Sequence, residues 1–149
     1  MIRAYRLVTA AAVVLVAGCV APAPTTSAYE SKAGMTAEAA LSELRTALVA
    51  TDTYTRGGMP APYLETLLVD AEESLGSVIT TFDSIQPPDA PDADALRNEL
   101  DPLLEDAGSG VTELRIAARR DDQAGLTTTA DGLTGVADEL EAFGKQHAS

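Results

Sequence analysis

Apolar residues recur at alternating intervals of four and three along the middle of the chain, most regularly from about Ala61 to Ile85. The residues of this stripe are Leu64, Leu68, Ala71, Leu75, Val78, Phe82 and Ile85. Such spacing places every one of them on the same face of an α-helix. Prolines at 60 and 62 suit the first turn, and the pair at 87 and 88 stops the helix. We therefore expect an amphipathic helix that must bury this face against other helices.

The same spacing recurs in three further segments. We expect one helix after Thr36 as N-cap, running to about Thr53, with Ala37, Leu41, Leu44 and Leu48 on its stripe. Another opens at Pro91 and carries Leu96, Leu100, Leu103, Ala107, Val111, Leu114 and Ala118. The last starts at Asp121 or Asp122, ends near Gly144 and Lys145, and carries Leu126, Ala130, Leu133, Ala137, Leu140 and Phe143.

Pro102 interrupts the segment that begins at Pro91 and leaves two interpretations open. The apolar stripe keeps its phase through Pro102, which favours one kinked helix. The alternative is a break, with Asp101 as the N-cap of a new helix.

Four amphipathic helices joined by short connections predict an all-α protein, an antiparallel up-down-up-down four-helix bundle over residues 36–146. No segment has the turn-bounded alternation of a β-hairpin, so no strand is expected.

The first nineteen residues have the three zones of a secretory signal: Arg3 and Arg6, the apolar run 7–16, then small residues. The run is about ten residues, whereas a membrane-spanning helix needs roughly 20. Its end, Val16-Ala17-Gly18-Cys19, resembles the lipobox of bacterial lipoproteins. The resemblance implies cleavage between Gly18 and Cys19, with diacylglycerol on the Cys19 thiol and a further acyl chain such as palmitate. A buried thiol, or an ordinary cleaved signal, is the alternative.

The resemblance divides the chain into a signal peptide (1–18), a lipidated cysteine with a disordered tether (19–35), and the bundle. Prolines, threonines and serines without a hydrophobic period suggest the tether. We expect a lipid-anchored protein on the extracytoplasmic face of the cell membrane. After cleavage the chain keeps eight basic residues and all 23 acidic ones, a net charge of −15. This charge disfavours nucleic acid as a partner.

Motifs for catalysis or metal binding do not stand out. The one histidine, His147, falls in the expected fraying tail, and Gly108-Ser109-Gly110 looks like a flexible patch rather than a nucleophile elbow. Asp89, Asp92 and Asp94 lack the glycine and glutamate of an EF-hand and suit a helix start. We expect no enzyme, no cofactor and no metal.

The loop between the first two predicted helices mixes aromatic residues, arginine and methionine with two glycines. Tyr54, Arg56, Met59 and Tyr63 are residue types enriched at protein interfaces, and we name them as candidate partner contacts. Alternatively, both tyrosines fold back over the end of the bundle.

The composition also resembles the small Ala- and Asp-rich lipoproteins of actinobacteria, most of which have no assigned activity. We therefore expect a non-enzymatic interaction or structural module of the cell envelope, with another envelope protein as partner. A ligand- or cation-binding module is the alternative. It would need a pocket between the helices, where Ala71, Ala107, Ala130 and Ala137 leave room or simply allow close packing.

Overall fold

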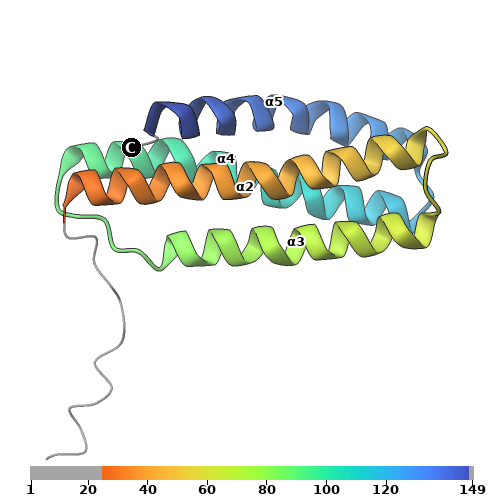
Figure 1. The fold of residues 1–149 in the computed structure, drawn as a ribbon, viewed down its shortest axis with the longest axis horizontal. Coiled ribbons are helices and arrows are strands. Elements are labelled where there is room, and N and C mark those ends of the chain that lie inside the picture. Colours follow the sequence, from red (N-terminus) through yellow and green to blue (C-terminus); the bar gives the residue numbers. More distant parts are fainter. Residues whose placement is uncertain (1–24, 148–149) are drawn as a thin grey trace, which may run out of the picture.

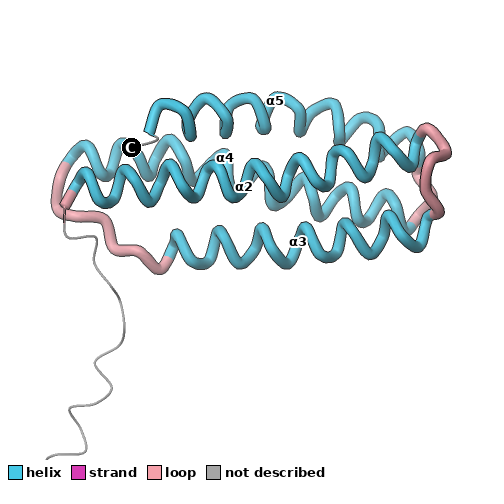
Figure 2. The backbone as a smooth tube through the Cα atoms, viewed as in Figure 1, coloured by secondary structure: helices cyan, strands magenta, loops and turns pink. Residues whose placement is uncertain are grey.

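The computed structural model describes residues 25–147, which form four α-helices: α2 (Thr26–Thr55), α3 (Ala61–Asp83), α4 (Pro91–Arg119) and α5 (Gln123–His147). Within these residues there is no strand. Each helix runs antiparallel to the one before it, and only short loops connect them (Figures 1 and 2). The predicted all-α up-down-up-down four-helix bundle is confirmed.

The four helices do not pack as a square. α2 contacts α3 and α5, α4 contacts the same two helices, and α2 also contacts α4 across the centre. α2 and α4 therefore form the short diagonal of the bundle, with α3 and α5 on either side of it (Figure 1). α2 is packed on three sides and keeps one face toward solvent.

α2 begins eleven residues earlier than the sequence predicted. Its N-cap is Thr25, whose Oγ1 accepts a hydrogen bond from the amide of Ala28 at 3.1 Å. Tyr29 and Ala33 are fully buried and continue the stripe of Ala37 at intervals of four. The predicted tether over 19–35 is therefore wrong from Thr26 onward, and its first six residues lie outside the described part.

Thr36, the predicted N-cap, lies inside α2. Its Oγ1 donates to the carbonyl of Lys32 at 2.8 Å, so the hydroxyl is satisfied within the helix. Alanine and glycine supply much of the buried surface in this first half of α2, and for that reason its composition looks like a linker.

α4 continues through Pro102 without a break, as phase continuity predicted. The proline ring is exposed, so the missing amide hydrogen bond lies on the solvent side of the helix. The stripe shifts slightly after it, because Leu104 is buried and Leu103 only half-buried. Asp92 and Asp94 occupy the first turn, where they suit the positive end of the helix dipole.

α5 extends to His147, past the predicted end at Gly144. Gly144 is buried against Glu38, and the imidazole of His147 is only 9% exposed. His147 Nδ1 lies 2.9 Å from Glu30 Oε1, and its ring centre lies 4.5 Å from that of Phe143. The interpretation of His147 as part of a fraying tail is wrong, because this contact fixes the end of α5 to the start of α2.

The core is continuous along the bundle and built mainly from leucine and alanine. The largest fully buried side chains are Tyr29, Phe82, Leu44, Leu64, Leu68, Leu75, Leu100, Leu104, Leu114, Leu126, Leu140 and Val111. Gly110 lets α4 and α5 approach closely, because a Cβ built there would lie 2.3 Å from a methyl carbon of Leu133. The Gly108-Ser109-Gly110 run is thus a packing site within a continuous helix and not a flexible patch.

Candidate functional site

Tyr54 closes the end of the bundle where α2 turns into α3. Its hydroxyl donates a hydrogen bond to Asp121 Oδ1 at 3.0 Å, and this contact with the carboxylate raises the pKa of Tyr54. Tyr54 is half-buried and so ties the α2–α3 loop to the α4–α5 connection. The turn that follows uses Gly57 in a left-handed conformation, with φ of 75°.

The other three candidate contacts of this loop point in different directions. Met59 is half-buried and packs against the core. Arg56 is exposed and pairs with Asp52 of its own helix, with 2.8 Å between Nη2 and Oδ1. Tyr63 is 57% exposed on the first turn of α3, so the alternative in which both tyrosines fold back is wrong for Tyr63. The four residues therefore form no single patch.

A groove instead runs along the border of α2 and α3, and we call it the α2–α3 groove. It consists of two hollows of about 570 and 290 Å³. The larger is lined by Glu38, Leu41, Ser42, Arg45, Thr46, Val49, Ala50, Thr53, Met59 and Leu67. The smaller is lined by Lys32, Met35, Thr36, Ala39, Ser77, Val78, Thr81 and Ile85.

The outward face of α2 forms one wall of this groove and carries a second stripe at helical spacing. The stripe comprises Met35, Ala39, Ser42, Thr46, Val49 and Thr53. We call these six residues the outer stripe. The first five are exposed, and Met35 and Val49 are the two most exposed large apolar side chains of the described residues, at 66% and 64%. α2 thus buries one stripe in the core and leaves a second, uncharged one in solvent.

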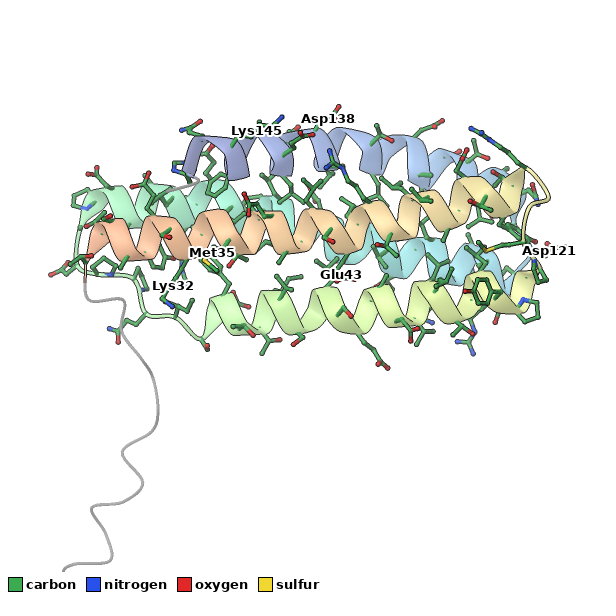
Figure 3. The ribbon with its side chains drawn as sticks, in the orientation of Figure 1. Lys32, Met35, Glu43, Asp121, Asp138 and Lys145 are labelled. Atoms are coloured by element: carbon green, nitrogen blue, oxygen red, sulfur yellow. The ribbon has the colours of Figure 1, made fainter. Side chains whose placement is uncertain are left out.

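Four carboxylates lie on or beside the walls of the groove. Glu38 lines the larger hollow, and Glu43 follows the groove residue Ala39 by four residues on α2. On α3, the exposed Asp70 and Glu73 precede the groove residue Ser77 by seven and four residues, which places them on the same side of that helix. None of these four forms an ion pair within residues 25–147. Figure 3 places Lys32, Met35 and Glu43 along the border of the two helices.

Positive charge in the groove is limited by pairing. Arg45 already bonds Glu141 of α5, which also binds Lys145. These two cations lower the pKa of the Glu141 carboxyl, Lys145 more strongly than Arg45. Lys32 remains as the one groove cation without an ion pair among the described residues.

Half-buried polar groups elsewhere hold helices together. On α3, Glu72 accepts hydrogen bonds from Thr112 Oγ1 at 2.7 Å and from the guanidinium of Arg115, both on α4. The Arg115 contact lowers the pKa of the Glu72 carboxyl. These groups join α3 to α4.

Asp101 lies beside a cavity of about 310 Å³ between α3 and α4, together with Ile79, Asp83, Leu104 and Glu105. Its Oδ1 is buried without a hydrogen-bond partner, and burial raises the pKa of its carboxyl. Over residues 25–147, no three or more His, Cys, Asp or Glu side chains come together in a way that could hold a metal ion.

The bundle axis is closely packed at the alanines where a ligand pocket was considered. Ala71, Ala107 and Ala137 are buried, and they line neither the α2–α3 groove nor the cavity beside Asp101. Ala130 borders a surface hollow between α2 and α5. The small side chains therefore serve close helix packing.

The predicted lipidation and cleavage residues, Gly18 and Cys19, lie outside the described residues. No helix within residues 25–147 combines the length and the hydropathy needed to cross a membrane. Comparison with protein-family models, with curated proteins and with solved structures found no significant match to this chain.

Proposed function

We propose that this protein is a membrane-tethered, non-enzymatic interaction module of the bacterial cell envelope, anchored through lipid on Cys19. The observation that supports it most is the outer stripe of α2, an uncharged face at helical spacing on an otherwise acidic surface. Scattered apolar residues are normal on a protein surface, whereas the outer stripe aligns Met35, Ala39 and Val49 with uncharged serine and threonine beside a groove, as a binding site does.

The position of α2 relative to the proposed anchor supports this function. Only residues 20–24 separate Cys19 from Thr25, the α2 N-cap, a distance of at most about 20 Å. α2 itself is 30 residues long, so its far end lies roughly 45 Å further along the helix axis. The start of α2 lies at the same end of the bundle as the end of α5 (Figure 1). The outer stripe would thus begin close to the membrane and extend away from it.

Two measurements test the proposal separately. Labelled fatty acid should be incorporated into the wild-type chain and not into Cys19→Ala; label on the Ala variant would overturn the anchor. The wild-type chain, solubilised from its native membranes in mild detergent, should co-purify with a specific envelope protein. Repeated recovery of the chain alone after cross-linking in intact cells would overturn the interaction function.

The larger hollow of the α2–α3 groove favours a second candidate, a ligand-binding lipoprotein. Its volume of about 570 Å³ falls within the range of small-molecule sites, and its floor is apolar. A small ligand that binds there should raise the melting temperature in a screen of metabolites. Absence of any shift, together with recovery of a protein partner, would favour the interaction module.

A further inference from the structure

We infer that the α2–α3 groove binds a cationic amphipathic α-helix of a partner protein. This inference rests on the proposed function and specifies the partner's chemistry. Three features of the groove lead to it: its length, the size of the side chains along it and the sign of the charges around it.

The groove is long enough to hold a helix. The two hollows follow one another along α2, from Lys32 to Thr53. At 1.5 Å per residue this stretch measures roughly 30 Å, the length of a helix of about twenty residues. The outer stripe alternates by four and three, the repeat at which one helix packs side chains into the spaces of another. A compact ligand would use only part of this length.

The side chains of the groove fit an apolar stripe on the partner. Ala39, Ser42 and Thr46 in the middle of the outer stripe are small, so a second helix can approach the α2 backbone closely there. Met35 and Val49 stand exposed toward the two ends. The opposite wall contributes half-buried apolar side chains: Met59 of the α2–α3 loop, Leu67 and Val78 of α3, and Ile85 just after α3. Burial of this surface requires matching apolar residues.

The charges define the flanks of the partner helix. α3 contains five acidic residues and no basic one, and Glu72 alone among them is paired within residues 25–147. Glu38 and Lys32 line the hollows, and Glu43, Asp70 and Glu73 lie beside them on α2 and α3. These are four carboxylates and one cation that form no ion pair within residues 25–147. Lysine or arginine beside the partner's apolar stripe would meet these carboxylates.

The same charges disfavour two other occupants. A second copy of the cleaved chain would carry the same net charge of −15 and would bring carboxylates against carboxylates. An anionic bilayer surface would be repelled for the same reason. A basic helix of another protein is the occupant that the charge pattern favours.

The test uses the full chain in nanodiscs of zwitterionic phosphatidylcholine and a fluorescent peptide of about 21 residues, with leucine and alanine at heptad core positions and lysine beside them. Anisotropy titration should show saturable binding, with empty nanodiscs as the blank. Ser42→Tyr places bulk in the groove without changing charge and should weaken binding about tenfold. Thr128→Tyr, exposed on α5, is the matched control and should bind like the wild type.

A second pair of variants separates specific flanks from general acidity. The double variant Glu43→Gln/Asp70→Asn should weaken peptide binding severalfold. The double variant Glu113→Gln/Glu139→Gln removes the same charge from α4 and α5, and it should bind the peptide as the wild type does. Circular dichroism and the melting temperature establish that each variant folds. A peptide with glutamate in place of lysine should not bind.

Each of the following results would overturn the inference. Binding of the lysine peptide is not saturable, or both charge-removing double variants lose the same amount of binding. The glutamate peptide binds as well as the lysine peptide, or the chain forms a dimer that Ser42→Tyr abolishes. Sedimentation with phosphatidylglycerol vesicles that depends on Ser42 would likewise assign the groove to the membrane. If Ser42→Tyr still co-purifies the envelope partner as well as the wild type does, the inference fails while the proposed function stands. If no partner is recovered, the proposed function itself fails.

Discussion

The hydroxyl of Tyr29 accepts a hydrogen bond from Arg97 Nε at 2.9 Å, which joins the first turn of α2 to the second turn of α4. Arg97 Nη2 also donates to the carbonyl of Ile85 at 2.8 Å, just after α3. The ring of Phe82 lies 5.7 Å from that of Tyr29 and 5.4 Å from the guanidinium carbon. One buried side chain from the first turn of α2 thus contributes to holding three helices at this end of the bundle.

Substitutions at Tyr29 test whether α2 begins at Thr26. Tyr29→Phe removes one hydrogen bond and should lower the free energy of unfolding by about 1 kcal/mol. Tyr29→Ala also leaves a cavity and should lower it by about 3 kcal/mol or more. Urea unfolding measures both, with exposed Tyr63→Phe as the control that changes little. Wild-type stability for Tyr29→Ala would show that the bundle starts further along the chain.

Two glycines should respond to alanine in opposite directions. Gly110→Ala forces a Cβ into Leu133 and should cost about 1 to 3 kcal/mol despite the better helix propensity. Gly132 on α5 has open space at the Cβ position, so Gly132→Ala should raise stability by up to about 1 kcal/mol. Thermal unfolding of the two variants side by side is the measurement. A gain in stability for Gly110→Ala would contradict the close α4–α5 packing.

Glu72 should stabilise the fold in its ionised form. Because the pKa of Glu72 is lowered in the folded state, its contribution is present above the ordinary value of 4.5 and is lost as the pH falls through the lowered pKa. Glu72→Gln should therefore cost about 1 kcal/mol at pH 7 and little at pH 3. Urea unfolding at both pH values tests this, with exposed Glu73→Gln as control. If Glu72→Gln lowers the free energy of unfolding equally at both pH values, the ion pair with Arg115 does not stabilise the fold.

Asp101 should have the opposite pH dependence. Burial raises its pKa above the ordinary 3.8, so ionisation destabilises the folded state as the pH rises through the raised pKa. Asp101→Asn removes the charge and should raise the melting temperature at pH 7 by a few degrees, about 4 °C per kcal/mol in a domain of this size. The gain should vanish near pH 3. A lower melting temperature at pH 7 would show that attraction to Arg97 outweighs burial.

The fold was predictable because leucine at alternating spacing is an unambiguous signal, as at Leu64, Leu68 and Leu75. The start of α2 was not, because Tyr29, Ala33 and Ala37 continue the stripe with residues that also occur in linkers. The interval of four between them was the available signal. The role of Arg97 at this end of the bundle could not be predicted from the sequence. Its contacts with the carbonyl of Ile85 and the ring of Phe82 form only when the helices pack together.

The candidate site was predicted only in part. Interface residue types led to the Tyr54–Tyr63 loop, and the structure instead turns Tyr54 inward to Asp121. Met59 is the one member of that set that also lines the α2–α3 groove. The outer stripe was hidden in the sequence because Ala39, Ser42 and Thr46 carry little hydrophobic signal. Its significance depends on knowing which face of α2 the other helices cover.

Photo-crosslinking in intact cells tests most directly whether the outer stripe meets a partner. A photoreactive amino acid replaces Val49, which is exposed in the groove, or Thr128, which is exposed on α5. We expect one specific protein adduct at position 49, mapped by mass spectrometry to a lysine- or arginine-rich helix of the partner, and none at position 128. Absence of any adduct at 49, or the same adducts at both positions, would contradict it.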